Sequence, residues 1–257
     1  MRYAVIFGII FNVLSVSTTA LAEKKTSYAI GVERIMYLPQ WAHDNQKYIG
    51  FARDFFDFFA TENNIGFQYK VLPIKRLFYE FLSEKSTLDF KFPDHPNWKS
   101  EMKKGANIVY SDPILHYIDG VVVLPKNKGK GLKNLKVLGT AMGFTPWDYL
   151  GHIKSKKIRL HENRSFTGLL EQVINGRIDG AYINITVSDY HLREIMKRPG
   201  ALVFDPGLPH TKDSYHLSTK TQPQLIKKVN TFLKQKKKEI EVLKGKFGIS
   251  DRIGEAR

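Results

Sequence analysis

Asn184 ends an apolar segment whose other residues need no polar partner. The segment GRIDGAYIN (176–184) places Ile178 and residues 181–183 in the pattern of a buried strand. A carboxamide at the end of such a strand can both donate and accept hydrogen bonds. It could bind a carbonyl, hydroxyl or amide group of a solute, or it could cap the helix that follows. The residues alone leave both interpretations open.

A second polar group precedes a predicted helix in GTAMGFTPWDYL (139–150). Pro146 suits the first position of a helix, and free backbone N–H groups at a helix start can hold a carboxylate or another anion. The alternative is an ordinary strand–turn–helix joint with Thr145 as its N-cap. Trp147 either lines a cleft or covers the core. The residues expected to contact an anion are Thr140, Gly143, Phe144 and Thr145.

The sequence offers little for catalysis. Its eight histidines are scattered, and it contains no H-E-x-x-H, G-x-S-x-G or P-loop segment. The absence of cysteine excludes disulfides, thiolate metal sites and catalytic thiols. Asp94 and Glu101 are the carboxylates considered for acid–base chemistry, but no pattern indicates that either is tuned for it. We therefore expect no enzymatic activity, no cofactor and no metal site.

The first residues have the composition of an export signal. Met1 and Arg2 precede an apolar run that ends in A-L-A at Ala20–Ala22. We predict a signal peptide over residues 1–22, cleaved after Ala22, because the alternative, a membrane anchor, is interrupted by polar residues. An exported chain without a cysteine for lipid attachment is expected in the periplasm, with secretion as the alternative.

The chain carries a formal charge of +15, with 40 basic and 25 acidic residues. The basic residues are spread along the sequence, and their densest run, LKQKKKEIEVLKGK, fits the solvated face of a helix. Nucleic-acid binding is therefore not expected, above all in the periplasm. The positive field favours anionic ligands.

Strand and helix patterns alternate along the mature chain, which predicts βαβ units and mainly parallel sheets flanked by helices. We predict an α/β fold of two lobes with a ligand between them. Residues 23–124 and 210–257 form the first lobe and residues 125–209 the second, with crossings near 124–134 and 203–210. Strands are expected at 26–33, 67–73, 136–139, 158–160, 176–184 and 201–209, and helices at 51–64, 74–84, from 146, 166–175 and 187–197.

Five motifs in this order resemble the amino-acid-type (family 3) periplasmic solute-binding proteins of ABC importers. They are Gly50-Phe51 with Asp54, YSDP (110–113), LKNLKVLGTAMGFTPWDYL (132–150), LLEQVINGRIDGAYIN (169–184) and KGKFG (244–248). The resemblance covers nearly all of the mature chain. It implies a type II, two-lobed fold that closes like a Venus flytrap around a small polar ligand.

Two departures from that family bear on the ligand. Its amino-acid-binding members use an Arg before the YSDP-like motif to grip the α-carboxylate, but residues 92–113 contain no arginine. A lysine there does not reproduce the bidentate fork of a guanidinium. The family's second anchor is an Asp that pairs with the ligand's ammonium, and Asn184 stands in its place. The resemblance thus implies that Asn184 faces a ligand other than a standard α-amino acid.

Further candidates follow from the same comparison. Related receptors place an aromatic in the loop after the first strand, and Tyr37 and Trp41 could form an apolar or cation–π wall there. Arg76 could supply the missing guanidinium, or it is a solvated helix residue. The segment KFPDHPNW (91–98) replaces a shorter loop of the family. The other residues assigned to the pocket are Phe92, Asp94 and Trp98 of this loop and Tyr110 of YSDP.

These observations predict a periplasmic receptor that traps a small polar or anionic solute and delivers it to the membrane permease of an ABC importer. One alternative is the ligand-presenting subunit of a membrane sensor. Another is a periplasmic enzyme similar to the dehydratases of cyclic acids that arose among relatives. We expect the protein to be a monomer.

Overall fold

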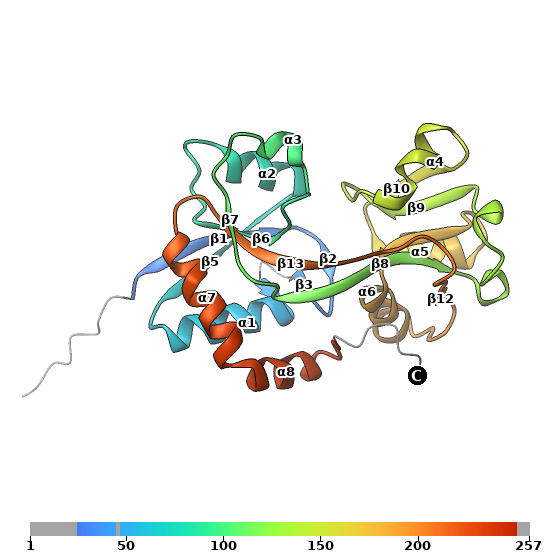
Figure 1. The fold of residues 1–257 in the computed structure, drawn as a ribbon. Helices are drawn as coiled ribbons and strands as arrows, with labels where there is room; N and C mark the ends of the chain where they lie inside the picture. The colour runs from blue at the N-terminus through green and yellow to red at the C-terminus, as the bar shows by residue number, and fades with distance from the viewer. Residues whose placement is uncertain (1–24, 45–46, 251–257) are drawn as a thin grey trace, which may run out of the picture.

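The computed structural model describes residues 25–44 and 47–250, which form two lobes joined by two long strands (Figure 1). This arrangement confirms the predicted α/β fold with two lobes. The expected signal peptide, residues 1–22, lies outside the described residues. None of the helices in the described part of the chain is long and apolar enough to cross a membrane.

The first lobe contains segments from both ends of the chain (Figure 1). Its three central strands are parallel in the order β5-β1-β6, with Ser27 opposite Gly66 and Ile30 opposite Phe90. The lobe comprises β1 (Ser27–Glu33), α1 (Phe51–Glu62), β5 (Gly66–Leu72), α2 (Ile74–Leu82), β6 (Phe90–Asp94), α3 (Ser100–Lys103), β7 (Val109–Tyr110), α7 (Pro223–Gln235) and α8 (Lys237–Lys246).

Aromatic packing holds the first lobe together. Helix α1 is amphipathic and buries one face rich in phenylalanine, as its apolar spacing predicts. The ring of Phe56 packs edge-on against Phe92 of β6 at 5.0 Å, and Phe58 packs against Phe232 of α7 at 4.9 Å. The second contact fixes the C-terminal helices on the first lobe.

A small antiparallel sheet follows β1 and was not predicted. It consists of β2 (Met36–Tyr37), β3 (Trp41–Asp44) and β4 (Lys47–Ile49). It leads into α1 through Gly50, whose φ of 99° disfavours other residues. A Cβ at Gly50 would lie 2.9 Å from the Cα of Trp41, so the glycine allows this sheet to approach the start of the helix.

The second lobe has its parallel strands in the order β10-β9-β11. Leu169, Leu170 and Val173 on one face of α5 are fully buried, as the helical spacing of the sequence predicts. The lobe comprises β9 (Val137–Ala141), α4 (Leu150–Lys154), β10 (Arg159–Asn163), α5 (Phe166–Ile174), β11 (Gly180–Asn184), α6 (Ile185–Tyr190), a π-helical segment (His191–Ile195) and β12 (Val203–Phe204).

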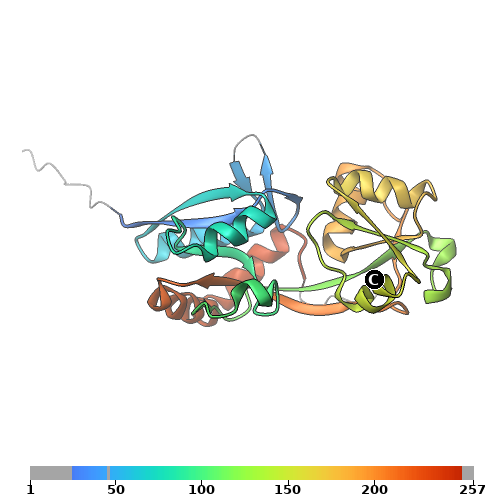
Figure 2. The same ribbon diagram turned by 90° about the horizontal axis from the view of Figure 1, so that it is seen from above.

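The two lobes are connected by β8 (Leu115–Val123) and β13 (Thr211–Thr219), which extend through both (Figures 1 and 2). They pair antiparallel, with Leu115 opposite Tyr215 and Asp119 opposite Thr211. A continuous sheet of order β10-β9-β11-β8-β13-β6-β1-β5 results. The crossings therefore lie in paired strands, and not in the segments 124–134 and 203–210 that we expected.

The segment 91–98 also differs from its prediction as a long loop. Its first residues belong to β6, which lies between β1 and β13 in the sheet. Proline has no N–H for a ladder and is tolerated in sheets mainly at edges and bulges. Pro93 lies where the pairing with β13 shifts register between His216 and Ser218, and this irregularity admits it.

Candidate functional site

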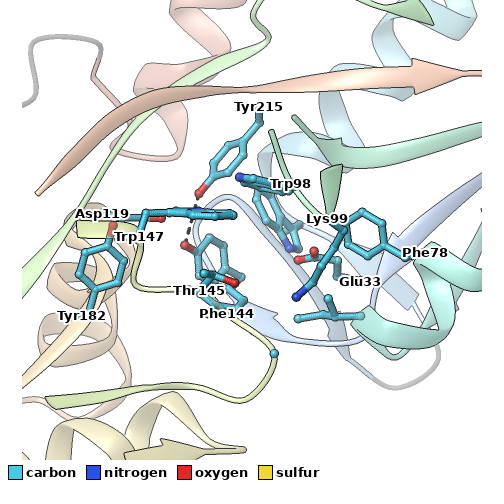
Figure 3. Close-up of a pocket in the computed structure, with 14 residues that line it drawn as sticks. Glu33, Phe78, Trp98, Lys99, Asp119, Phe144, Thr145, Trp147, Tyr182 and Tyr215 are labelled. Carbon is cyan, nitrogen blue, oxygen red and sulfur yellow. Dashed lines mark hydrogen bonds between the residues drawn. The ribbon is translucent and has the colours of Figure 1, made fainter. Parts of the chain in front are cut away.

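A cavity lies between the lobes, beside the paired strands that connect them. The space that the centre of a water molecule can occupy in it is about 60 Å³. Since one water needs about 10–15 Å³ by this measure, the cavity suits a ligand portion of a few non-hydrogen atoms. Its walls come from both lobes (Figure 3): Glu33, Tyr37, Trp41, Ile74, Phe78, Trp98, Lys99, Asp119, Gly143, Phe144, Thr145, Trp147, Tyr182 and Tyr215.

The wall residues come from the ends of some elements and from the middle of others. Glu33 is the last residue of β1, and Tyr37 and Trp41 belong to the small sheet that follows. The second lobe contributes Tyr182 of β11 and the turn after β9, where Gly143 has a φ of 92°. The connecting strands add one wall residue each, from β8 and β13. A change in the angle between the lobes would therefore change the shape of the cavity.

The cavity has mainly aromatic walls. Tyr37 and Trp41 lie with their ring centroids 4.8 Å apart, and Tyr215 meets Trp41 edge-on at 5.0 Å. Trp98 also meets Tyr215 edge-on, at 5.8 Å. The planes of the two edge-on pairs differ by 81° and 66°, so these rings face the cavity in several directions and do not form one flat platform.

Aromatic contacts also join the two lobes. Tyr37 of the first lobe contacts two rings of the second, Phe144 at 5.6 Å and Phe166 at 5.3 Å. Its hydroxyl group lies 3.3 Å from that of Tyr215 on β13. Tyr37 therefore touches both lobes and one of the strands that connect them.

Glu33 is the acidic wall residue of the first lobe. It is only 4% exposed. Burial raises the pKa of Glu33 to about 7, although the nearby Lys91 lowers it, and Asp94 raises it further. Desolvation disfavours the charged carboxylate, so this group gains and loses its proton near neutral pH.

Asp119 is a second acidic wall residue, on strand β8. One of its carboxyl oxygens, Oδ1, is buried and has no hydrogen-bond partner among the described residues. Burial raises the pKa of Asp119 to about 7, and the negative charge of Asp213 adds to the rise. Glu33 and Asp119 lie on opposite sides of the group of aromatic rings (Figure 3).

Seven residues selected from the sequence line this cavity together. They come from three separate segments of the chain, and the list is Tyr37, Trp41, Trp98, Gly143, Phe144, Thr145 and Trp147. Trp147 lies at the rim, where 42% of its surface is exposed. Their assembly in one place supports a binding role for them, which remains a prediction.

Four other selected residues of the first lobe do not line the cavity. Arg76 is exposed on α2 and does not supply a guanidinium to it. Phe92 is fully buried in the core, because it belongs to β6 and not to a loop. Asp94 is buried in ion pairs with two lysines, and Tyr110 of β7 lines a separate hollow beside α3. Glu101 lines that same hollow.

The turn after β9 is poorly suited to holding an anion, contrary to our expectation. The N–H of Met142 donates to the carbonyl of Asn163, that of Gly143 to Glu162 Oε1, and that of Phe144 to the carbonyl of Ala141. Three backbone donors that could have faced an anion are thus already used. Thr140 is fully buried, and its hydroxyl donates to the carbonyl of Tyr182.

Asn184 caps the helix that follows it, which is the second of the two roles considered for it from the sequence. Its Oδ1 accepts hydrogen bonds from the N–H groups of Thr186 (2.9 Å) and Val187 (3.1 Å), which makes it the N-cap of α6. Its Nδ2 donates to the hydroxyl of Tyr215 at 3.4 Å. Asn184 is fully buried and does not line the cavity, so it can affect a ligand only through Tyr215.

None of the three charged wall residues, Glu33, Asp119 and Lys99, was predicted, and neither were Ile74, Phe78, Tyr182 and Tyr215. A signal for the acids was present, because Glu33 ends the strand SYAIGVE and Asp119 interrupts the apolar run LHYIDGVVV. A charged residue in a strand that is otherwise buried indicates a partner or a function, as argued above for Asn184. Lys99 gave no comparable signal, since it is one of three lysines within a few polar residues.

The comparisons with known proteins bear on the fold. No family model matches the chain, and no curated protein sequence is significantly similar to it. An ancestral arginine-binding protein solved with arginine superposes with a TM-score of 0.68 at 17% identity, over 88% of this chain and 99% of the other. The chain has the two-lobed fold of type II periplasmic binding proteins.

Two more solved structures share this periplasmic-binding-protein fold. A periplasmic binding protein of an arginine transport system from Legionella pneumophila gives a TM-score of 0.66 at 14% identity, over 87% of this chain and 100% of the other. The ancestral amino-acid-binding protein AncCDT-1, described as a precursor of cyclohexadienyl dehydratase, gives 0.64 at 19% identity, over 86% and 95%. At these identities the likeness concerns the fold.

Proposed function

We propose that this protein is a periplasmic solute-binding protein, which closes its lobes on a small solute and delivers it to the membrane permease of an ABC importer. One observation carries the proposal: both lobes and both connecting strands contribute walls to a single cavity. A ligand that contacts both lobes stabilises the closed arrangement relative to the open one. Solved proteins of this fold that bind arginine or belong to transport systems support it.

The solute proposed for the cavity is not a standard α-amino acid. None of the described residues that line it is an arginine, so no guanidinium fork is available for an α-carboxylate. In the part of the chain that the structure describes, the basic wall residue is Lys99, whose ammonium is a point charge. Free α-amino acids should therefore bind weakly.

Ligand-induced closure of the lobes is a direct test of the proposed receptor function. The chain contains no cysteine, so cysteines placed at the exposed Lys85 of the first lobe and Lys154 of the second would be the only labelled positions. Energy transfer between dyes at these sites should rise when a ligand binds. The panel contains amino acids, organic acids, sugars and amines. If no compound changes energy transfer or raises the melting temperature, the proposal is wrong.

Location and partner need separate tests. The exported protein should begin at Glu23, which N-terminal sequencing of a periplasmic extract would establish. Adjacent permease and ATPase genes would support an importer as the partner, whereas an adjacent kinase or cyclase gene would support a sensor.

One observation favours a second candidate function. Both carboxyl groups of the cavity have a pKa of about 7, a value that suits a general acid or base near neutral pH. A dehydratase that acts on a cyclic acid could use such a group. Turnover of a cyclic hydroxy acid by the purified protein, abolished by Glu33→Gln or Asp119→Asn, would establish this function over the first.

A further inference from the structure

The charge of the cavity walls differs from the charge of the whole chain. The chain is strongly basic, but the walls contain two carboxyl groups and one ammonium group. When both carboxyl groups are ionised, the walls therefore carry a net negative charge. Negatively charged walls would repel the anionic solute that the overall charge of the chain suggested. The backbone N–H groups of residues 142–144 already donate hydrogen bonds within the protein, so they are not free to bind an anion.

The aromatic walls suit a positive charge. The face of an aromatic ring is electrostatically negative and attracts a cation within about 6 Å of its centroid. Tyr215 meets Trp41 and Trp98 at steep angles of 81° and 66°, Tyr37 lies tilted by 32° against Trp41, and Trp147 stands at the rim. A cation between such rings contacts them from several directions at once. A flat sugar ring would instead need one extended platform.

The carboxyl groups are available to a ligand. Asp119 Oδ1 is buried without a hydrogen-bond partner among the described residues, and the Glu33 carboxyl group lines the cavity beside the indole of Trp41. A buried carboxylate oxygen without a partner is costly, and a cation or an N–H donor from a ligand would remove that cost. The two carboxyl groups face the cavity from opposite sides (Figure 3).

We infer that the cavity takes a small organic cation, an amine or a quaternary ammonium compound without a carboxylate group, held between the aromatic walls and the carboxyl groups of Glu33 and Asp119. This inference rests on the proposed function and names its ligand class. Lys99 opposes the cation, because its ammonium lies in the same wall (Figure 3). The inference therefore predicts opposite effects for the removal of the acids and the removal of this lysine.

The protonation of the cavity gives the binding a characteristic pH dependence. The charged groups acting on Glu33 are Lys91 and Asp94 of β6, and Lys99 shares its wall. Asp119 is influenced by Asp213 of β13, while the phenols of Tyr37, Tyr182 and Tyr215 adjoin it in the wall. A permanent cation favours the ionised form of both acids, so its affinity rises as the pH increases through about 7.

Matched probes isolate the effect of charge. Choline and 3,3-dimethylbutan-1-ol have the same shape but differ by the positive charge on nitrogen. Butylamine and butan-1-ol form a second pair. Calorimetry of the full mature chain should show that each cation binds about tenfold more tightly than its neutral counterpart, or better. Equal affinity within both pairs would overturn the inference.

Single substitutions test whether Glu33, Asp119 and Lys99 determine the preference for a cation. Asp119→Asn and Glu33→Gln should each weaken the binding of choline about tenfold and change that of the neutral alcohol little. Lys99→Gln should strengthen choline binding, whereas Lys104→Gln, at an exposed lysine outside the cavity, should leave it unchanged. If Lys99→Gln instead weakens choline binding and acetate binds better than choline, the site prefers anionic ligands and the inference is wrong.

The labelled protein distinguishes this failure from failure of the proposed function. If a sugar or an organic acid closes the lobes but no cation does, the inferred ligand class is wrong, whereas the proposed receptor function is still supported. If no compound closes the lobes, the receptor function itself is wrong. Cation affinity that rises about tenfold between pH 5.5 and 7.5 in the wild type, but not in the double variant of the two acids, supports the inference.

Discussion

The imidazole of His191 in the second lobe donates a hydrogen bond from Nε2 to the carbonyl oxygen of Met36 in the first lobe, at 3.2 Å. His191 is almost fully buried, and its other ring nitrogen, Nδ1, has no partner among the described residues. Unlike the aromatic contacts of Tyr37, this bond is directional. It therefore favours one particular closed arrangement of the lobes.

Removing this bond should favour opening. His191→Phe keeps a buried ring of similar size but cannot donate to Met36. A hydrogen bond of this kind contributes about 1 kcal/mol, so the ratio of closed to open molecules should fall about fivefold. Energy transfer between dyes at positions 85 and 154 measures that ratio. An unchanged distribution would show that the bond does not contribute to closure.

Acidification should have a similar effect through the same residue. Burial lowers the pKa of His191, because the charged imidazolium is desolvated. A histidine with a lowered pKa stabilises the folded, closed form at a pH above its ordinary value, and this contribution is lost as the pH falls through the lowered value. The closed fraction of the wild type should thus decrease as the pH falls below the ordinary pKa of histidine, about 6.5, and that of His191→Phe should change less.

Glu33 should make the free energy of unfolding decrease as the pH rises, whereas His191 favours the closed form at higher pH. Its pKa rises on folding from 4.5 to about 7, so its contribution is complete below pH 4.5 and is lost as the pH rises through 7. Glu33→Gln removes this titration, and between pH 5 and 8 the wild type should lose about 3 kcal/mol relative to the variant. Urea unfolding across this range measures the difference, with the exposed Glu84→Gln as control. Parallel curves for wild type and Glu33→Gln would contradict the prediction.

Asp94 should be essential for stability. Its carboxylate accepts from Lys103 at 2.7 Å and from Ser218 at 2.7 Å and lies 3.2 Å from the ammonium of Lys91. Burial raises its pKa, but the two lysines outweigh this effect and lower it overall. Asp94→Asn leaves two buried ammonium groups without their carboxylate, so it should cost about 3–5 kcal/mol in urea unfolding.

Lys103→Met is the matched variant for this cluster. It leaves Lys91 and Asp94 as a balanced pair, so its cost should be clearly smaller than that of Asp94→Asn. Equal costs would show that the cluster does not depend on charge balance.

Replacement of Asn184 separates capping from ligand binding. Asn184→Ala removes the acceptor for the N–H groups of Thr186 and Val187 and should cost about 1 kcal/mol of unfolding free energy. Asn184→Ser keeps a neutral N-cap acceptor without burying a charge and should be less destabilising. A large loss of choline affinity in Asn184→Ala with no loss of stability would contradict the capping role.

Periodicity in the sequence predicted most elements of the fold. The phenylalanine spacing of α1 and the apolar runs of β1 and β11 are local signals, and the structure contains these elements within a few residues of the predicted bounds. Pro93 misled the prediction of β6, because its tolerance depends on a register shift in β13, which lies more than 120 residues later in the chain. Such a pairing has no local sequence signal.

The candidate site was predictable only in part, for the same reason. Tyr37, Trp41 and the turn 143–147 stand at ends of predicted strands, where an inter-lobe cavity is expected. Asp119 and Tyr215 reach the cavity because β8 and β13 cross between the lobes side by side. Since the crossings were expected elsewhere, these two residues could not be placed.

The pairing of β8 with β13 also limits how the molecule can move. Two separate linkers would allow each lobe to twist and drift independently, but hydrogen bonds between Leu115–Asp119 and Thr211–Tyr215 tie the linkers into one ribbon. We expect such a ribbon to bend mainly perpendicular to its plane, so that lobe movement would be described by a single hinge angle. For the proposed receptor function, a membrane partner that touches both lobes could recognise the closed form by this one angle, without contacting the ligand.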